Sequence, residues 1–201
     1  MKAILLLVFP CVFLAALAAD ASAPVPSPAD TRARELISAL HLNFLPGESG
    51  YFGVIGRSDQ KVVREGRELA AQSQIYYLLT AELPVNYLHW LASDDTHVLL
   101  EGGPVDYFIF HPDGRAEQVT LGRDAAAGQR LVVAVPAGCW KALRLHPGAK
   151  FALLANVLSP EWTADRVKVG AGPEFLRKFT NAAPWATGEF LRGLIGPNYS
   201  R

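Results

Sequence analysis

The sequence predicts an all-β domain with flanking helices, and three observations lead to this fold class. The chain has 201 residues, half of them apolar, which is enough for one ordinary domain with a buried core. Its 17 glycines and 14 prolines separate many short apolar runs. Such runs with turn residues between them are typical of a β-barrel or a β-sandwich, and this pattern alone does not choose between the two.

The N-terminus has the features of a secretory signal peptide. Lys2 precedes an almost unbroken apolar run over residues 3–17, and Ala16-Leu17-Ala18 fits a small-x-small cleavage site, with Ala19-Asp20-Ala21 as an alternative. The run is shorter than the about 20 apolar residues that a membrane span needs. We therefore expect residues 1–18 to be a signal peptide, and the mature protein to be secreted and to have no membrane contact.

The segment after the signal peptide is rich in proline and small residues, and we expect a linker over residues 19–34. Asp30 or Thr31 can cap a helix. Leu36, Ile37 and Leu40 then follow at helical spacing.

A barrel domain is expected over residues 35–169, because strand-like runs rich in aromatic and β-branched residues recur there. The polar stretch between residues 59 and 71 predicts a solvated loop or a short exposed hairpin. Residues 170–201 predict packing helices and a tail, with Pro173 and Thr187 at two helix starts. The expected strands cover residues 51–55, 74–79, 105–110, 116–121, 131–135, 140–145 and 151–158.

Charge and cysteine content restrict the partners and the covalent chemistry. The formal net charge is zero and no basic run is present, which argues against a nucleic-acid partner. Cys11 lies in the expected signal peptide, so Cys139 alone remains after cleavage and an internal disulfide is excluded. Cys139 is then a buried thiol, an exposed reactive thiol or part of an intermolecular bridge, and of these we expect the buried thiol.

A cluster of titratable residues lies between two strand-like runs at residues 88–97. If a strand begins near Asp95, alternation places His97 on the same face, and His89 approaches from the preceding strand. The cluster then lines a pocket, with Tyr51 or Phe52 and one of Tyr76 or Tyr77 on its walls. Such a pocket suits a small organic ligand. The alternative is that these are surface residues at a strand end.

An ordered set of short motifs resembles the cupin superfamily, and within it the cupin-5 family. Asp95 is followed by Gly102 and later by a Pro136-x-Gly138 turn, which resembles the two-part cupin signature. The resemblance implies a double-stranded β-helix, the cupin jelly-roll barrel, with a pocket for a small molecule, and it suggests a homodimer. The remaining pieces, all in the family's order, are Glu48-Ser49-Gly50-Tyr51-Phe52, Arg57-Ser58, Ile75-Tyr76-Tyr77-Leu78-Leu79, His89, Asp113-Gly114, Leu121-Gly122 and Cys139-Trp140.

The resemblance also bears on metal binding. Many cupin enzymes hold a metal with two histidines and an acid from the first motif and a histidine from the second. Here Leu91 stands two residues after His89, and Lys141 stands three residues after Gly138, so two of the four ligand positions are lost. We therefore expect no metal and no other cofactor.

Two functions remain open. In related sugar epimerases a histidine–aspartate pair is the base and a tyrosine is the acid, which would make His89 and Asp95 catalytic here. The family pattern, however, has arginine where this chain has Trp90 and glutamate where it has Val54. These losses and the predicted secretion favour a protein that binds a small, sugar-like ligand without catalysis. The expected ligand-contacting residues are Tyr51, Phe52, Tyr76, Tyr77, Trp90, His97 and Lys141.

Overall fold

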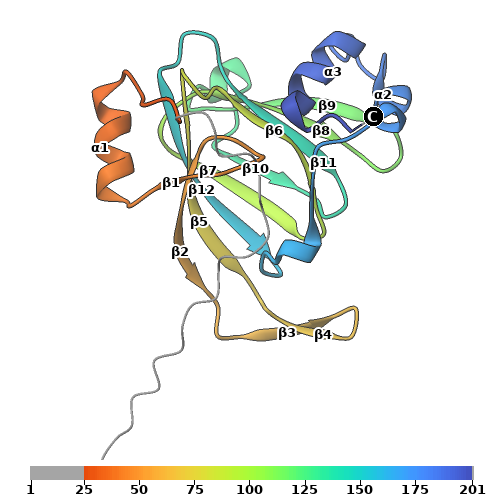
Figure 1. Cartoon of the computed structure of the whole chain (residues 1–201), viewed down its shortest axis with the longest axis horizontal. Helices are drawn as coiled ribbons and strands as arrows, with labels where there is room; N and C mark the ends of the chain where they lie inside the picture. Colours follow the sequence, from red (N-terminus) through yellow and green to blue (C-terminus); the bar gives the residue numbers. More distant parts are fainter. Residues whose placement is uncertain (1–24, 201) are drawn as a thin grey trace, which may run out of the picture.

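The computed structural model describes residues 25–200, and the expected signal peptide and its cleavage sites lie outside these residues. Two antiparallel sheets face each other, with helices at both sides (Figure 1). The predicted all-β fold with flanking helices is therefore confirmed. One sheet has the order β1 (Asn43–Phe44), β2 (Tyr51–Arg57), β5 (Ser73–Thr80), β12 (Phe151–Ser159), β7 (Asp94–Gly102), β10 (Val132–Val135), and the other β13 (Val167–Val169), β6 (Val85–Leu91), β11 (Trp140–Leu145), β8 (Val105–Phe110), β9 (Ala116–Leu121).

The space between the sheets is filled by alternate residues of these strands. Leu79 on β5 and Leu154 on β12 meet Tyr107 and Ile109 of β8 in one buried apolar cluster. Their neighbours in the sequence point the other way, because successive side chains of a strand face opposite sides of the sheet. The same alternation decides which polar residues reach the interior.

Helix α1 (Thr31–Ala39) covers part of the outer face of the six-stranded sheet. The carboxylate of Asp30 accepts a hydrogen bond from the Ala33 amide and so caps the helix. Leu36 packs there with Tyr51 and Leu78. The helix begins at Thr31, so the last four residues of the expected 19–34 linker are helical.

Helices α2 (Pro173–Phe179) and α3 (Gly188–Ile195) cover the outer face of the five-stranded sheet (Figure 1). The ring of Phe110 on β8 meets the rings of Phe175 and Phe179 at centroid distances of 4.9 and 5.1 Å. Thr187 caps α3 by accepting a hydrogen bond from the Phe190 amide. Both helices lie in the segment for which packing helices were predicted.

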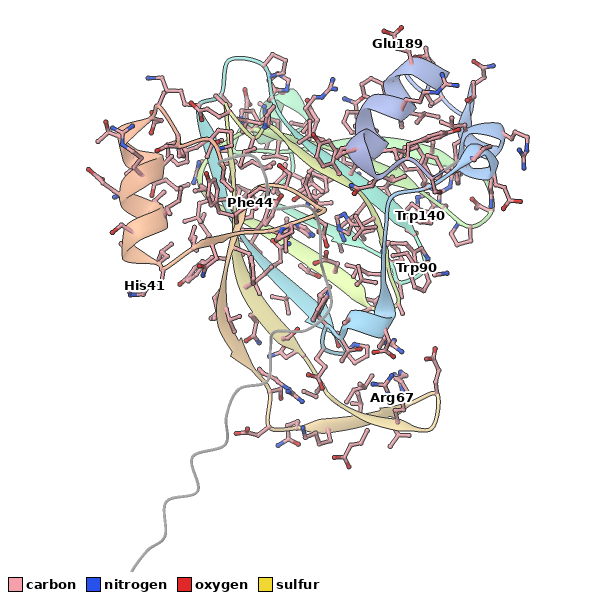
Figure 2. The ribbon with its side chains drawn as sticks, viewed as in Figure 1. His41, Phe44, Arg67, Trp90, Trp140 and Glu189 are labelled. Atoms are coloured by element: carbon pink, nitrogen blue, oxygen red, sulfur yellow. The ribbon has the colours of Figure 1, made fainter. Side chains whose placement is uncertain are left out.

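The polar segment between β2 and β5 forms a hairpin of β3 (Lys61–Arg64) and β4 (Arg67–Ala70), which is one of the two predicted alternatives. Its turn residues Glu65 and Gly66 have φ values of 52° and 74°, as two-residue hairpin turns require. Ion pairs of Glu65 with Arg166 and of Arg67 with Asp165 fasten the hairpin to the short 3₁₀ turn Ala164–Arg166. Arg67 is labelled in Figure 2.

Cys139 lies in the interior apolar cluster, and burial raises the pKa of its thiol. Because the thiolate is the reactive form, we expect native protein that begins at Ala19 to react slowly with a chromogenic disulfide at pH 7, and rapidly in urea. A matched Val63→Cys variant, on the exposed face of the hairpin, should react at once in buffer. Equally rapid labelling of Cys139 in the native protein would contradict its burial.

Candidate functional site

The alternation predicted for β7 is present. Asp95 and His97 point between the sheets and are 3% and 1% exposed, while Asp94 is exposed to solvent. Leu99 continues the inward row into the apolar cluster. The polar residues of β7 therefore form one end of an otherwise apolar interior.

Four interior side chains form a continuous row of polar contacts. The Tyr107 hydroxyl lies 2.9 Å from His97 Nδ1, and His97 Nε2 lies 2.7 Å from Asp95 Oδ2. The same Asp95 oxygen lies 2.7 Å from Nζ of Lys141, which is 2% exposed. Lys141 belongs to β11 and Asp95 to β7, so this ion pair joins the two sheets across the interior.

The charges of this row hold Asp95 in its ionised form. Burial alone would raise the pKa of the Asp95 carboxyl, but His97 and Lys141 outweigh burial and lower that pKa well below its usual range. Burial also raises the pKa of Tyr107, and because the charge of Asp95 acts in the same direction there, that pKa lies well above 10. At neutral pH Asp95 is therefore a carboxylate and Tyr107 a neutral phenol.

Two buried oxygen atoms beside this row accept no hydrogen bond from residues 25–200. They are Oδ1 of Asp95 and Oδ1 of Asn156. Asn156 is paired with His97 in the β12–β7 register, and its Nδ2 lies 3.5 Å from His97 Nε2. Buried acceptors normally have a donor, so each of these two atoms retains the capacity to accept a hydrogen bond.

His89 lies on β6, across the strand pair from Lys141. Its Nδ1 lies 2.8 Å from the Tyr87 carbonyl oxygen, which can only accept, so Nδ1 carries the proton. Its Nε2 is then an acceptor and lies 3.6 Å from Oε2 of Glu48. Burial is the main cause that lowers the pKa of His89 to about 4, so the ring is neutral at pH 7.

The loop before β2 holds Glu48 in this position. Asn86 on β6 donates from Nδ2 to the Glu48 carbonyl and carboxylate oxygens, both at 3.3 Å. The Tyr77 hydroxyl donates to the Ser49 carbonyl at 2.7 Å. Gly50 has a φ of 77°, and any side chain there would collide with the Tyr77 hydroxyl.

The structure gives His89 and Asp95 different hydrogen-bonding partners. His89 contacts Tyr87 and Glu48, whereas Asp95 contacts His97 and Lys141. The histidine–aspartate pair that the epimerase alternative assigned to His89 is formed by His97.

Alternation along β2 and β5 separates the four predicted wall residues. Phe52 and Tyr77 are register partners and pack in the interior cluster, so they lie on the same side as His97. Tyr51 and Tyr76 belong to the cluster under α1, on the outer face of the sheet.

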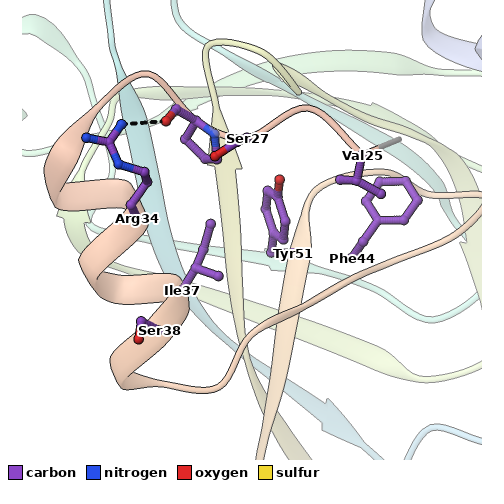
Figure 3. A pocket seen from close by; sticks show the side chains of 8 residues that line it. Val25, Ser27, Arg34, Ile37, Ser38, Phe44 and Tyr51 are labelled. Carbon is purple, nitrogen blue, oxygen red and sulfur yellow. Dashed lines mark hydrogen bonds between the residues drawn. The ribbon is translucent and has the colours of Figure 1, made fainter. Parts of the chain in front are cut away.

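Tyr51 lines a separate cavity of about 340 Å³ outside the barrel, with Ile37 of α1 and Phe44 of β1 (Figure 3). Its hydroxyl donates to the Pro26 carbonyl at 2.7 Å. The expectation that Tyr51 and Tyr76 contact a ligand in the barrel is therefore wrong, because both side chains point away from it.

Trp90 also lies outside the barrel. Its indole Nε1 donates to the Gly138 carbonyl at 2.8 Å, and the Lys168 ammonium lies 4.6 Å from its ring centroid. It is the cross-strand partner of Trp140, and both are labelled in Figure 2. The expectation that Trp90 contacts a ligand in the barrel is wrong, because this residue faces the side of the C-terminal helices.

Four residues of the interior site were not predicted from the sequence: Glu48, Asn86, Tyr107 and Asn156. Glu48 stood within one of the cupin-like motifs, but nothing nearby in the sequence connected it with His89. Tyr107 and Asn156 sit in apolar strands whose alternation could have assigned them to the inner face. The register that brings them to His97 is a long-range feature.

The donor set does not fit a resident metal. Leu91 occupies one ligand position of the cupin pattern, and Lys141 places a cation 2.7 Å from the only acid of the row. Within residues 25–200 no group of three or more His, Cys, Asp or Glu side chains is placed to hold a metal ion. Transition metals generally need about three protein ligands.

The buried His89 gives a testable dependence of stability on pH. The pKa of His89 is 6.5 in an unfolded chain and about 4 in the folded protein, so the unfolded state binds more protons between these values. The contribution is complete above pH 6.5 and is lost as the pH falls toward 4, by roughly 3 kcal/mol for a shift of this size. Urea unfolding of the wild type and of His89→Gln from pH 7 to 4 measures it.

The His89→Gln variant should lose less stability over this range than the wild type. A His41→Asn variant, at an exposed turn, should follow the wild type. Parallel curves for the wild type and His89→Gln would show that His89 does not titrate as a buried group.

Comparisons with known proteins agree with this architecture. The family model Cupin_5, described as Cupin superfamily (DUF985), matches residues 34–169. An uncharacterized protein from Saccharomyces cerevisiae is 32% identical over 127 residues, which are 56% of this chain and 63% of the yeast protein. The match therefore spans less than two thirds of that relative.

Two solved structures share the fold. A hypothetical protein from Leishmania major has a TM-score of 0.63 and 28% identity, covering 69% of this chain and 87% of the other. A protein from Shewanella oneidensis has a TM-score of 0.65 and 24% identity, covering 84% and 97%, and this likeness shows the fold alone. The predicted resemblance is confirmed, since the family model matches well over half of the chain. This protein belongs to the cupin-5 family of the cupin superfamily.

Proposed function

We propose that this cupin is a secreted binding protein that takes a small, hydroxyl-rich, sugar-like ligand into its barrel without a metal. The observation that carries the proposal is the pair of buried acceptors, Asp95 Oδ1 and Asn156 Oδ1, which receive no hydrogen bond from the described residues. A ligand hydroxyl could donate to each of them. An unpaired buried acceptor costs about 1–3 kcal/mol, so a donor that reaches it gains affinity.

The other polar groups of the interior fit the same kind of ligand. His89 Nε2 and the Glu48 carboxylate offer two further acceptors. An ammonium group has three protons, and the ion pair of Lys141 with Asp95 uses one of them. Lys141 can therefore donate to a ligand oxygen. A ligand hydroxyl can donate a hydrogen bond to one of these acceptors and accept one from Lys141, so a hydroxyl-rich ligand matches both kinds of group.

Phe52 and Tyr77 supply an apolar wall beside these polar groups. The ring faces of aromatic residues suit the C–H surfaces of a compact ligand, while a few polar groups fix its orientation. This combination supports a small molecule with both polar and apolar faces.

The hydrogen bonds of His97 favour binding over the epimerase-like alternative. A general base needs a nitrogen that can reach the substrate proton. Both ring nitrogens of His97 are occupied, one by Tyr107 and the other by Asp95. His89 has a free nitrogen, but its pKa of about 4 makes it a weak base at neutral pH.

Secretion remains a proposal that rests on residues 1–18, outside the described part of the chain. Within residues 25–200, no helix combines the length and the apolar character needed to cross a bilayer. The test is expression in a secreting host, followed by mass spectrometry of the exported protein to determine its first residue.

Ligand binding is tested with neutral monosaccharides, inositols and sugar acids, using titration calorimetry on the chain from Ala19. We expect at least one of these ligands to bind, and Asn156→Leu and His89→Gln to weaken it about fivefold each, the usual value of one hydrogen bond of about 1 kcal/mol. Asn43→Leu, on an exposed strand, should bind as the wild type does. If no compound binds, or if all variants bind alike, the barrel is not the binding site.

We also propose a homodimer in which β2 extends the sheet of a second copy. Beyond Phe52, the outer edge of β2 pairs with no strand among residues 25–200. Val54 and Ile55 on this stretch are 65% and 46% exposed. Unpaired edges with apolar side chains tend to pair with another chain.

The dimer proposal predicts the effect of a charge on this edge. Val54→Lys should shift the sedimentation equilibrium from dimer to monomer, because the charge is placed in the apolar contact. Val63→Lys on the hairpin, a valine of similar exposure, should leave the dimer intact. A wild-type protein that is monomeric at high micromolar concentration would exclude this pairing.

A further inference from the structure

The polar side chains at this end of the interior are of the types that bind transition metals. Asp95 and His97 on β7, His89 on β6 and Glu48 before β2 supply two carboxylates and two imidazoles. Metals of the first transition row favour these oxygen and nitrogen ligands. In this barrel, however, the positive charge beside Asp95 is the ammonium group of Lys141.

The contacts of Lys141 place its ammonium group among these ligand types. Nζ lies 2.7 Å from Asp95 Oδ2, the oxygen that also contacts His97 Nε2 at 2.7 Å. The charge of Lys141 also acts on His89, its cross-strand partner. We infer that the Lys141 ammonium takes the place of a divalent metal ion, and that this barrel becomes a metal site when the cation is replaced by a metal ligand.

Electrostatics supports this inference. Asp95 is buried and ionised, so it needs a cation close to it. Lys141 satisfies the need and at the same time repels a second cation from the same oxygen. Removing Lys141 leaves His97 as the remaining partner of Asp95 Oδ2, and a divalent ion could then supply the positive charge that was lost.

The geometry shows what a metal would still lack. Asp95 Oδ2 and His97 Nε2 are 2.7 Å apart, whereas two ligands of a tetrahedral zinc ion with bonds of about 2 Å lie roughly 3.3 Å apart, so these two side chains must separate slightly to share an ion. These two residues alone are below the usual three ligands. Lys141→His adds an imidazole on β11, the strand whose residue 141 reaches Asp95 of β7 across the interior.

The experiment compares Zn²⁺ uptake by purified wild type, K141H and K141R, after incubation with excess Zn²⁺ and gel filtration. We expect about one zinc per chain in K141H and less than a tenth in the wild type and K141R. The thermal midpoint of K141H should rise with added Zn²⁺, whereas that of the wild type should not. K150H, at an exposed lysine, controls for a histidine added elsewhere.

Each outcome decides the inference. Zinc bound by K141H and lost again in K141H with His97→Asn supports it, as does a K141H protein that folds only when Zn²⁺ is added. Equal zinc contents in K141H and K150H overturn it, as does a K141H protein that zinc neither binds nor stabilises. Stoichiometric zinc in the wild type also overturns it.

The inference shares its residues with the proposed binding site, but its test needs no organic ligand. Zinc uptake by K141H together with a failed sugar screen would overturn the proposed ligand and leave the role of Lys141 intact. The reverse result would retain the ligand and remove the inference.

Discussion

The ion pair between Lys141 and Asp95 is the interaction on which the polar half of the interior depends. It joins β11 of one sheet to β7 of the other, and both side chains are almost fully buried. Burying two charges costs several kcal/mol per ion, and their attraction only roughly offsets this cost. The pair is therefore a poor source of stability. The pair instead fixes the positions of its two side chains, because removing either one would leave the other charged and buried between the sheets.

The strand register separates the interior into an apolar end and a polar end. Along β7 the inward row runs from Asp95 through His97 to Leu99, and along β11 it runs from Lys141 to Leu143 and Leu145. Each polar residue thus lies opposite a polar residue of the facing sheet, and each leucine joins the apolar cluster. The apolar end can then stabilise the fold by burial, while the polar end holds the hydrogen-bonding groups on which the proposed ligand binding rests.

The sequence predicted the inner face of β7 because side-chain alternation is a local property that needs only the strand and one inward residue. It predicted neither the partner of His89 nor the choice between Tyr51 and Phe52. Between Asn86 and His89, β6 has one more residue than the stretch of β11 that pairs with it. Asn86 and His89 therefore both point inward although they are three positions apart. Such a bulge and the register of β2 with β5 arise from long-range pairing, which no short stretch of sequence encodes.

The same long-range contacts change the chemical interpretation of the two histidines. From the sequence, His89 and Asp95 were expected to form a pair, and a pair of this kind would suit a general base. In the structure Asp95 shares one oxygen between His97 and Lys141, so its charge is already balanced. His97 is fixed by Tyr107 on its other nitrogen, and His89 is neutral beside Glu48. An interior in which the acid is paired with lysine and the histidine is held at both nitrogens fits the proposed binding role better than the epimerase-like one, because the epimerase-like role needs a histidine nitrogen that can take a substrate proton.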